Sequence, residues 1–265
     1  MLLGILNLLL LCLLTGCGTS KINSHSTGLW EKFVWFFALS IKFLSFGGSM
    51  GIGIILLTFI IKMALFPLMM FQMKSMRKMQ EIQPELKKLK EKYPGKDMES
   101  RRLLNEETQR LYSEKGVNMY AGCLPMLAQL PFMWGLYQSI FRVDEIHNGQ
   151  FLWLDLGQYD PYYVLPVLAA IFTFVTSWLT MKASPEQNGM TKTMTYFMPI
   201  IILFMAFRMF SGVTLYWVVQ NILQAIQTLL INNPFKIQKE REKKEQEKRD
   251  LEKAKRKALK KALKK

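Results

Sequence analysis

The sequence contains few of the residues from which catalytic and metal sites are built. It has 3 cysteines and 2 histidines in 265 residues, with no CxxC pair, and His25 lies far from His147. No phosphate-binding P-loop, GxSxG elbow or HExxH helix occurs. Gly51 and Gly53 lack a third glycine and begin an apolar run, which indicates helix packing. We therefore predict a protein that is not an enzyme and that holds no metal or cofactor.

Charge is scarce over long stretches and concentrated in others. The chain carries 35 Lys+Arg against 20 Asp+Glu, a net charge of +15, yet half of its residues are hydrophobic and its mean hydropathy is +0.10. These values agree only if apolar and charged residues form separate blocks, as they do here. Runs of roughly 20 apolar residues can cross a bilayer core about 30 Å thick. The sequence predicts an all-α, multi-pass membrane protein and excludes a single soluble globular domain.

The amino terminus resembles a bacterial lipoprotein signal. Residues 1–14 are apolar but too short to span a membrane, and the small residue Gly16 precedes Cys17. The resemblance implies a signal peptide over 1–16, cleavage before Cys17, and diacylation of its thiol with chains such as palmitate. An uncleaved signal with an incidental cysteine is the alternative.

Loop charges predict the orientation of the spans, because Lys and Arg are retained in the cytoplasm. Residues 72–118 hold 12 Lys+Arg and 8 acids, and the tail from 234 holds 15 and 6. Residues 142–161 hold one Arg and four acids. We expect a bacterial plasma membrane protein with its amino terminus outside, its carboxyl terminus inside and a lipid anchor at Cys17. The five predicted spans are about 50–71, 119–141, 162–181, 194–210 and 212–231.

We expect four regions along the chain. After the signal peptide, 17–49 form a lipid-anchored segment in which 29–45 fold as an aromatic helix in the outer membrane interface. A five-helix core follows over 50–233, and 234–265 form a basic cytoplasmic tail. Within the core, 72–118 form a cytoplasmic helical hairpin, with Pro84 at the start of one helix and Asp97 capping the other.

Lys62 is an ionisable residue within the first predicted span. It lies twelve residues after Met50 and nine before Phe71, about 14–18 Å from either end at about 1.5 Å per residue. A charge at such depth is costly unless it contacts water or a partner, and the other four spans contain no acid to pair with it. A water-filled groove satisfies this requirement; a shorter span that places Lys62 near an interface is the alternative.

Polar residues of the other spans are candidates to line this groove. They recur at helical spacing in the third and fifth spans, and single residues accompany them in the first and second. Ordinary hydrogen bonds between helices are the alternative explanation for each. The candidate groove residues besides Lys62 are Thr58, Gln129, Thr173, Thr176, Ser177, Thr180, Trp217, Gln220, Gln224 and Gln227.

The tail has the spacing of a charged helix. Glu240, Glu245 and Glu252 each precede a Lys or Arg by four residues, which supports helix formation. Acids are absent after Glu252. Such an end can bind anionic lipids or ribosomal RNA phosphates, or can remain solvated and only determine orientation.

Together these residues resemble the YidC/Oxa/Alb family of membrane protein insertases, in its short Gram-positive lipoprotein form. Residues 118–131 resemble the family's Gly-Cys-Leu-Pro…Gln-x-Pro signature, and 151–156 and 211–217 resemble other recurring segments. The similarity covers nearly the whole mature chain. Two positions depart from the family pattern: Lys62 stands where an Arg is usual, and Phe210 where a proline often precedes the Ser-Gly turn. Lys lacks the bidentate fork of Arg, which bears on how strongly it pairs with a client.

The resemblance implies five helices around a hydrophilic groove that opens to the cytoplasm. It also implies insertion of nascent membrane proteins, alone or with the Sec translocon. Lys62 would attract acidic extracytoplasmic segments of the client, and the basic tail would bind the ribosome. A ribosome tether at the membrane and a small-ion transporter are rival hypotheses. The transporter is disfavoured because the sequence shows neither paired intramembrane charges nor an inverted repeat.

Overall fold

The computed structural model describes residues 20–95, 97–117, 124–184, 189–231 and 233–262. The predicted signal peptide, Cys17 and Cys123 lie outside the described residues. The predicted all-α class is confirmed, since helices dominate and the described residues add one β-hairpin with two residues in each strand. The elements are α2 (Leu29–Leu44), α3 (Met50–Ala64), α4 (Phe66–Glu81), α5 (Gln83–Lys92), α6 (Met98–Glu114), α7 (Leu124–Arg142), α8 (Asp144–His147), β1 (Gln150–Phe151), β2 (Leu154–Asp155), α9 (Val164–Ala183), α10 (Gly189–Ala206), α11 (Ser211–Ile231) and α12 (Pro234–Ala262).

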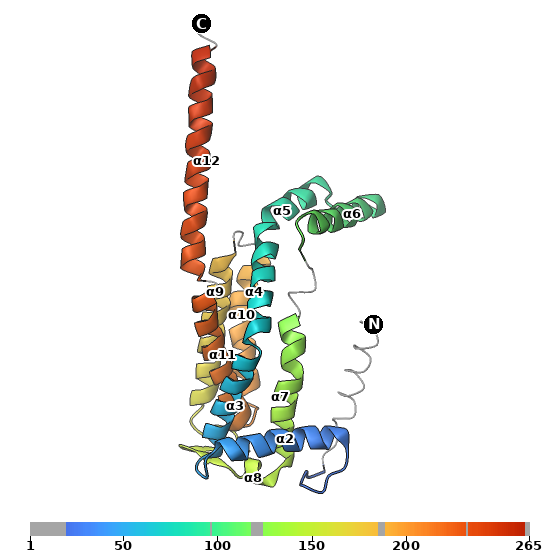
Figure 1. Cartoon of the computed structure of the whole chain (residues 1–265), viewed down its shortest axis with the longest axis vertical. Coiled ribbons are helices and arrows are strands. Elements are labelled where there is room, and N and C mark those ends of the chain that lie inside the picture. The colour runs from blue at the N-terminus through green and yellow to red at the C-terminus, as the bar shows by residue number, and fades with distance from the viewer. Residues whose placement is uncertain (1–19, 96, 118–123, 185–188, 232, 263–265) are drawn as a thin grey trace.

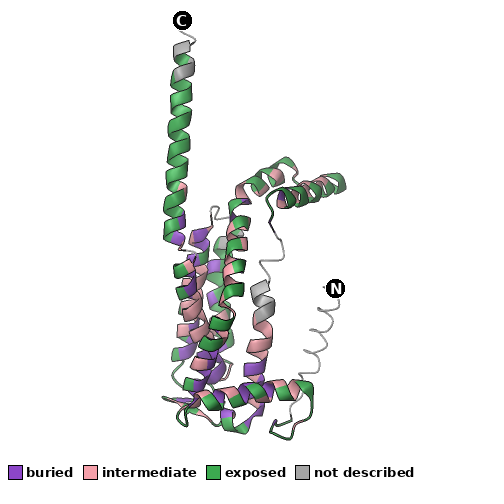
Figure 2. Cartoon of the chain, viewed as in Figure 1, coloured by how far each residue is buried: buried purple, intermediate pink, exposed green. Residues whose placement is uncertain are grey.

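The long helices form an upright bundle with different structures at its two ends (Figure 1). Helix α2 lies across one end, next to α8 and the β-hairpin, and we call this the α2 end. At the other end α5 and α6 project to the side and α12 extends far beyond the bundle, and we call this the α12 end. Figure 2 shows that buried residues are most frequent at the α2 end, whereas α12 is exposed along most of its length.

Helix α2 confirms the helix predicted over 29–45 and covers its end of the bundle. Its side chains at Val34, Phe37 and Ile41 are buried in the core, while Phe36 and Phe43 are exposed. A helix that is apolar on both its buried and its exposed face is typical of contact with lipid.

The predicted helix packing at Gly51 and Gly53 is confirmed. A Cβ atom at Gly53 would lie 2.2 Å from the carbonyl oxygen of Ile41 in α2, and one at Gly51 would lie 2.2 Å from the ring of Phe151. Only glycine leaves room for the Ile41 backbone at Gly53 and for the Phe151 side chain at Gly51. These two residues let α3 contact both α2 and the β-hairpin.

The hydrophobic core is concentrated at the α2 end. Ile54 of α3, Ile140 of α7, Leu156 of the loop after β2 and Val213 of α11 are almost fully buried there. The hydroxyl of Ser211 donates to the carbonyl of Asp155 at 2.5 Å, which ties the start of α11 to the hairpin. Interdigitated apolar side chains therefore fill this end of the bundle.

The first predicted span, about 50–71, contains a break in the structure. Helix α3 ends at Ala64, and α4 leaves it at an angle of 61° and continues to Glu81, ten residues past the predicted end. Pro67 explains the break, because proline lacks an N–H to donate and its ring clashes with the preceding turn. The first part of the predicted 72–118 hairpin is therefore a continuation of this bent helix pair.

The remaining span boundaries agree more closely. Helices α9 and α11 lie within two residues of the predicted 162–181 and 212–231, whereas α10 begins and ends about five residues earlier than 194–210. Among the described residues, α9 by itself is long and apolar enough to cross a membrane, and α3 with α4 qualifies as one broken span.

The hairpin and tail predictions are confirmed in their local structure. Pro84 occupies the first turn of α5, and the Asp97 carboxylate accepts the backbone N–H of Ser100 at 3.0 Å as the cap of α6. The tail forms the single long helix α12. Its Glu245 pairs with Arg249 as the spacing predicts, at 3.7 Å.

Candidate functional site

Lys62 lies in the last turn of α3 and is buried, with 3% of its surface exposed. Its Nζ donates to Oε1 of Gln224 in α11 at 3.0 Å and lies 3.9 Å from the Sδ of Met69 in α4. Within the described ranges no carboxylate lies at ion-pair distance from it. One neutral amide and one thioether compensate poorly for the lost hydration of an ammonium group. The site is therefore suited to a further partner, either water or an anionic group.

A second polar cluster joins α7 to α11. The Gln129 amide donates to the Tyr216 hydroxyl, and the amide of Gln220 donates to Oε1 of Gln129 at 2.9 Å. Gln129 and Gln220 were both candidates from the sequence. Tyr216 was not, although it stands next to Trp217 in the 211–217 segment; its burial at a polar contact could be recognised only in three dimensions.

The other candidates on α11 are only partly engaged. Trp217 is half-buried, and its carbonyl accepts the Asn221 amide at 2.9 Å. Gln227 is buried, and its Oε1 has no hydrogen-bond partner. Of the predicted face, Gln220 and Gln224 therefore carry the contacts with α7 and α3.

Two candidate hydroxyls are bonded largely within their own helices. Thr58 is buried and donates to the carbonyl of Ile54, one turn earlier, at 2.6 Å. Thr176 donates to Phe172 at 2.7 Å and also lies 3.4 Å from the carbonyl of Asn221 in α11. The Thr58 hydroxyl thus donates within α3, while Thr176 links α9 to the polar face of α11.

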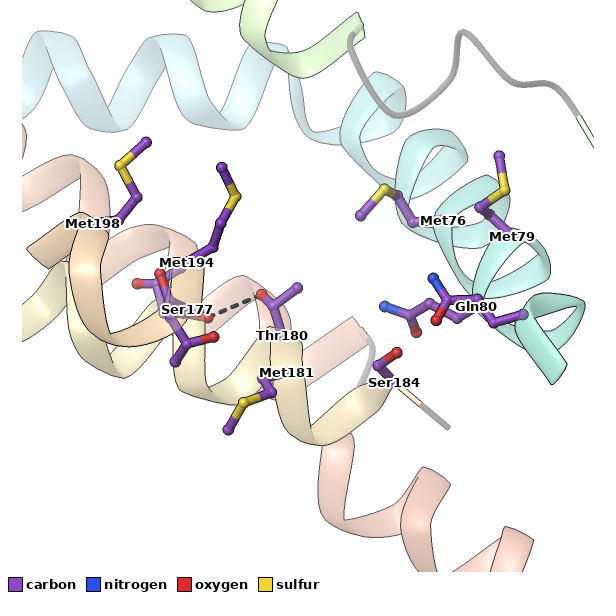
Figure 3. A pocket seen from close by; sticks show the side chains of 12 residues that line it. Met76, Met79, Gln80, Ser177, Thr180, Met181, Ser184, Met194 and Met198 are labelled. Atoms are coloured by element: carbon purple, nitrogen blue, oxygen red, sulfur yellow. Dashed lines mark hydrogen bonds between the residues drawn. The ribbon is translucent and has the colours of Figure 1, made fainter. Parts of the chain in front are cut away.

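The hydroxyls of α9 are divided between two environments. Thr173 is partly buried, and its buried hydroxyl has no partner. Ser177 and Thr180 line a cavity of about 430 Å³ together with Thr176, and Thr180 donates to the Thr176 carbonyl at 2.9 Å. Figure 3 shows this cavity between α9 and α10 on one side and α4 on the other. Its lining residues are Met76, Met79, Gln80, Gln83, Thr176, Ser177, Thr180, Met181, Ser184, Met194, Thr195 and Met198.

The sequence placed all candidates around one groove, and the structure distributes them over two places. Lys62, Gln129 and the glutamines of α11 do not line the cavity beside Ser177 and Thr180. Because successive helical residues are rotated by about 100°, a stripe of hydroxyls can reach two different neighbours. Thr176 connects the two places, since it lines the cavity and contacts Asn221.

A second buried cation, Arg142, lies at the α2 end and was not among the candidates from the sequence. Its side chain is 2% exposed, its Nε donates to the Ser20 carbonyl at 2.7 Å, and its Nη2 lies 3.1 Å from the Ser20 hydroxyl. Nη2 also lies 3.5 Å from the Glu31 carboxylate. The Arg142 carbonyl accepts the N–H of Ile22 at 2.9 Å. The amino-terminal segment is thereby fastened to the end of α7.

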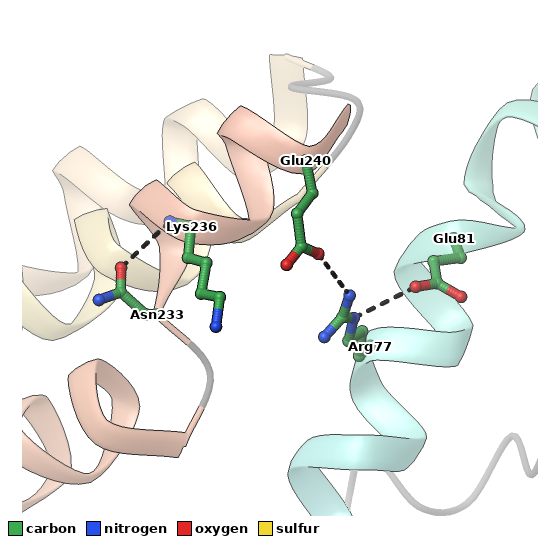
Figure 4. Close-up of polar contacts among 5 residues, drawn as sticks. All are labelled: Arg77, Glu81, Asn233, Lys236 and Glu240. Carbon is green, nitrogen blue, oxygen red and sulfur yellow. Dashed lines mark hydrogen bonds and ion pairs between the residues drawn. The ribbon is translucent and has the colours of Figure 1, made fainter. Parts of the chain in front are cut away.

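At the α12 end, ion pairs join α4 to the tail (Figure 4). Arg77 lies 3.2 Å from Glu81 within α4 and 3.4 Å from Glu240 of α12. The sequence predicted Glu240 to support α12 through Lys244, and the structure shows that it also reaches another helix. Partial burial lowers the pKa of the neighbouring Arg241 guanidinium, an effect that Glu81 opposes.

The sequence of this chain matches a known family and its members. A family model described as 60Kd inner membrane protein matches residues 42–242. "Membrane protein insertase YidC 1" of Lactococcus lactis is 56% identical over 255 residues, covering 96% of this chain and 95% of the relative. "Membrane protein insertase YidC" of Enterococcus faecalis is 55% identical over 234 residues, covering 88% and 85%.

A solved structure has a related fold. "Active YidC insertase crystal structure with the first transmembrane domain resolved" is similar with a TM-score of 0.59 and 28% sequence identity. The similarity covers 76% of this chain and 47% of the other, so this chain corresponds to about half the length of that insertase.

Proposed function

We propose how this chain handles its clients, given that it belongs to the 60Kd inner membrane protein family and is a YidC-type membrane protein insertase, an all-α protein of the membrane. We propose that Lys62 provides a cationic, hydrated site for the polar segment of a nascent membrane protein that must cross to the outside. The observation that carries the proposal is the burial of the Lys62 ammonium with Gln224 and Met69 as its contacts.

The physical reason is the cost of moving polar groups through lipid. Polar side chains at Gln129, Gln220 and Gln224 shorten the apolar distance that the client segment must cross. Lys62 attracts acidic residues of that segment, because its ammonium contacts no described carboxylate. The client's apolar span then partitions into lipid along α9 and α11. No covalent step is required.

We also propose the orientation that the loop charges indicate: five spans, the amino terminus outside and the carboxyl terminus inside. The exposed apolar side chains of α3, α9 and α10, such as Phe59, Ile171 and Phe204, support contact of these helices with lipid. Removal of 1–16 and diacylation of Cys17 would tether the mature amino terminus at the outer surface. The four regions 1–16, 17–49, 50–233 and 234–265 are part of this proposal.

The proposed partners follow from charge. The exposed basic helix α12 suits the binding of ribosomal RNA or anionic lipid. The Sec translocon would act together with this insertase on clients that require both. Assistance to client folding, a chaperone role, would accompany insertion. A ribosome tether without a groove function is the main alternative, and it would require α12 but not Lys62.

A charge-swap experiment tests the role of Lys62. Cells depleted of the insertase receive Lys62→Ala, Lys62→Glu or Lys62→Arg, with Lys42→Ala as a control at an exposed lysine. The client is a single-span protein with an acidic outer tail. We expect Lys62→Ala and Lys62→Glu to reduce insertion by about tenfold or more, equivalent to about 1.4 kcal/mol, and Lys62→Arg to retain it.

The client's charge provides the second half of the test. Changing its acidic outer tail to a basic one should restore insertion by Lys62→Glu, because the attraction is re-established with opposite signs. Equal insertion by the parent and Lys62→Glu would disprove the groove mechanism. Loss of insertion on deletion of 236–265, with Lys62 variants active, would favour the tether.

A further inference from the structure

The cavity at the α12 end is lined by five methionines from three helices. Met76 and Met79 come from α4, Met181 from α9, and Met194 and Met198 from α10. Figure 3 shows the methionines of α4 and those of α10 on opposite sides of the space, with Ser177 and Thr180 of α9 beside it. Its volume of about 430 Å³ lies within the range of about 300–1,000 Å³ typical of binding pockets.

This lining is not that of an ordinary core. Met194 and Met198 are exposed, so they do not fill an interior gap. Methionine is flexible and polarisable, and surfaces rich in it adapt to apolar partners of different shape. None of the described residues that line the cavity is charged. The cavity therefore suits apolar side chains of varied size.

A polar feature of the cavity restricts the occupant further. Gln80 is 8% exposed, lines the cavity, and has an Oε1 without a hydrogen-bond partner. An unpaired buried acceptor calls for a donor from the ligand. A peptide provides such donors, since the first turn of a helix has up to four free N–H groups. A lipid acyl chain has none.

The cavity and the Lys62 site are linked through α4 on one side and through α9 and α11 on the other. Met69, whose sulfur contacts Lys62, precedes Met76 by seven residues on α4, which places the two on one face of that helix. On the other side, Thr176 lines the cavity and its hydroxyl reaches Asn221 of α11. A peptide in the cavity thus adjoins the helices that hold Lys62 and Gln224.

We infer that the methionine-lined cavity binds the apolar segment of a nascent client as it enters, before its polar flank reaches Lys62. The inference rests on the proposed function, which places the α12 end in the cytoplasm. The methionines hold the apolar side chains, and the Gln80 oxygen accepts a backbone N–H of the client. Binding here keeps the segment out of water until it partitions into lipid.

Photocrosslinking to stalled nascent chains of increasing length tests the inference. A photoreactive amino acid replaces Met79 or Met194, and Met98, which is 83% exposed on α6, is the matched control. We expect crosslinks at Met79 and Met194 to short chains whose apolar segment has just emerged, at about tenfold the yield at Met98. Crosslinks at both positions only to phospholipid, or only to chains whose span is already inserted, would overturn it.

Repeating the crosslinking in Lys62→Ala separates this inference from the proposed function. We expect the early crosslinks at Met194 to persist while insertion fails, because capture precedes the step at Lys62. If the early crosslinks at Met194 are absent and insertion still depends on Lys62, binding at the cavity is refuted and the role of Lys62 is not. Crosslinks with insertion independent of Lys62 would refute the mechanism at Lys62 and retain the cavity.

Substitutions provide a second readout. The double variant M194K/M198K places two charges at the cavity and should reduce early crosslinking at Met79 by about tenfold. The double variant M194L/M198L keeps the cavity apolar and should retain crosslinking at Met79 to clients with a leucine-rich span. M98K is the control and should change nothing. Unchanged crosslinking in M194K/M198K, with thermal unfolding like the parent's, would contradict the inference.

Discussion

Two buried cations lie at different depths in this bundle, Arg142 at the α2 end and Lys62 between the two ends, and their surroundings differ in kind. Arg142 at the α2 end contacts the carbonyl and the hydroxyl of Ser20 and the carboxylate of Glu31. Lys62, near the junction of α3 and α4, contacts one neutral amide and one thioether. A guanidinium held by several acceptors strengthens structure, whereas an ammonium with so few remains available for a ligand.

The two ends of the bundle also differ in how their side chains are packed. At the α2 end the core is closely packed, with glycines where backbones meet and Ile54, Ile140 and Val213 almost fully buried. At the α12 end, Gln80 and Gln227 are buried with unpaired oxygens. Polar groups left without partners cost stability and are kept where function needs them. Unpaired buried polar atoms also occur at the α2 end, at Trp30 and Trp134, so the two ends differ in packing: the α2 end is closely packed, whereas the α12 end contains a cavity of about 430 Å³.

Replacing Arg142 should have the largest effect on stability. Arg142→Met removes the guanidinium that donates to Ser20 and lies beside the partly exposed Glu31, and each hydrogen bond to such a charged group contributes about 1.5–3 kcal/mol. Thermal unfolding of the detergent-solubilised protein should show a clearly lower midpoint, and protease should cut more readily near residue 20. A midpoint equal to the parent's would mean that the two cations are not different in kind.

Gly53→Ala tests the close packing of the α2 end. The new Cβ would meet the backbone oxygen of Ile41 at 2.2 Å, and overpacking of this type costs about 1–3 kcal/mol. Gly189→Ala is the matched control at the start of α10, where an added Cβ meets nothing within 4 Å. Only the first substitution should lower the unfolding midpoint; equal effects would contradict the packing contrast.

Lys62→Met should separate stability from function. It removes one interhelical hydrogen bond, worth about 0.6 kcal/mol, and also removes the cost of burying an ammonium group. We expect the unfolding midpoint to stay the same or rise while insertion of the acidic-tailed client is lost. A strongly lowered midpoint would assign Lys62 a structural role like that of Arg142.

The exposed pair Lys42–Glu145 should contribute least. Its atoms lie 2.6 Å apart, yet both side chains are about half exposed, and such pairs contribute about 0.2–1 kcal/mol. A double-mutant cycle of Lys42→Ala and Glu145→Ala in thermal unfolding measures this value. A coupling as large as the effect of Arg142→Met would mean that burial does not distinguish these ion pairs.

The sequence predicted the elements well where a pattern is repeated along the chain. The helix over 29–45, the span ends near α9 and α11, the Asp97 cap and the helical tail follow from hydrophobic runs, capping residues and charge spacing. It also singled out Lys62 by its position in an apolar run. The bend at Pro67 was missed because the apolar run continues through it, and run length alone does not register a lost N–H.

The arrangement of the site was less predictable. Spacing places Gln220 and Gln224 on one face of α11, but it does not reveal that one contacts Gln129 and the other Lys62. Arg142 looks like an ordinary loop charge in the sequence. Its burial depends on Ser20, more than a hundred residues away.

The sequence by itself determined that this is an all-α membrane protein with a cation in an apolar segment, because hydropathy and charge act locally and can be read along the chain. Only the tertiary structure decided which polar groups find partners. Hydrogen bonding and burial depend on which helices meet. For this reason Arg142 binds the amino-terminal segment to α7, whereas Lys62 and the methionine-lined cavity remain available to a client.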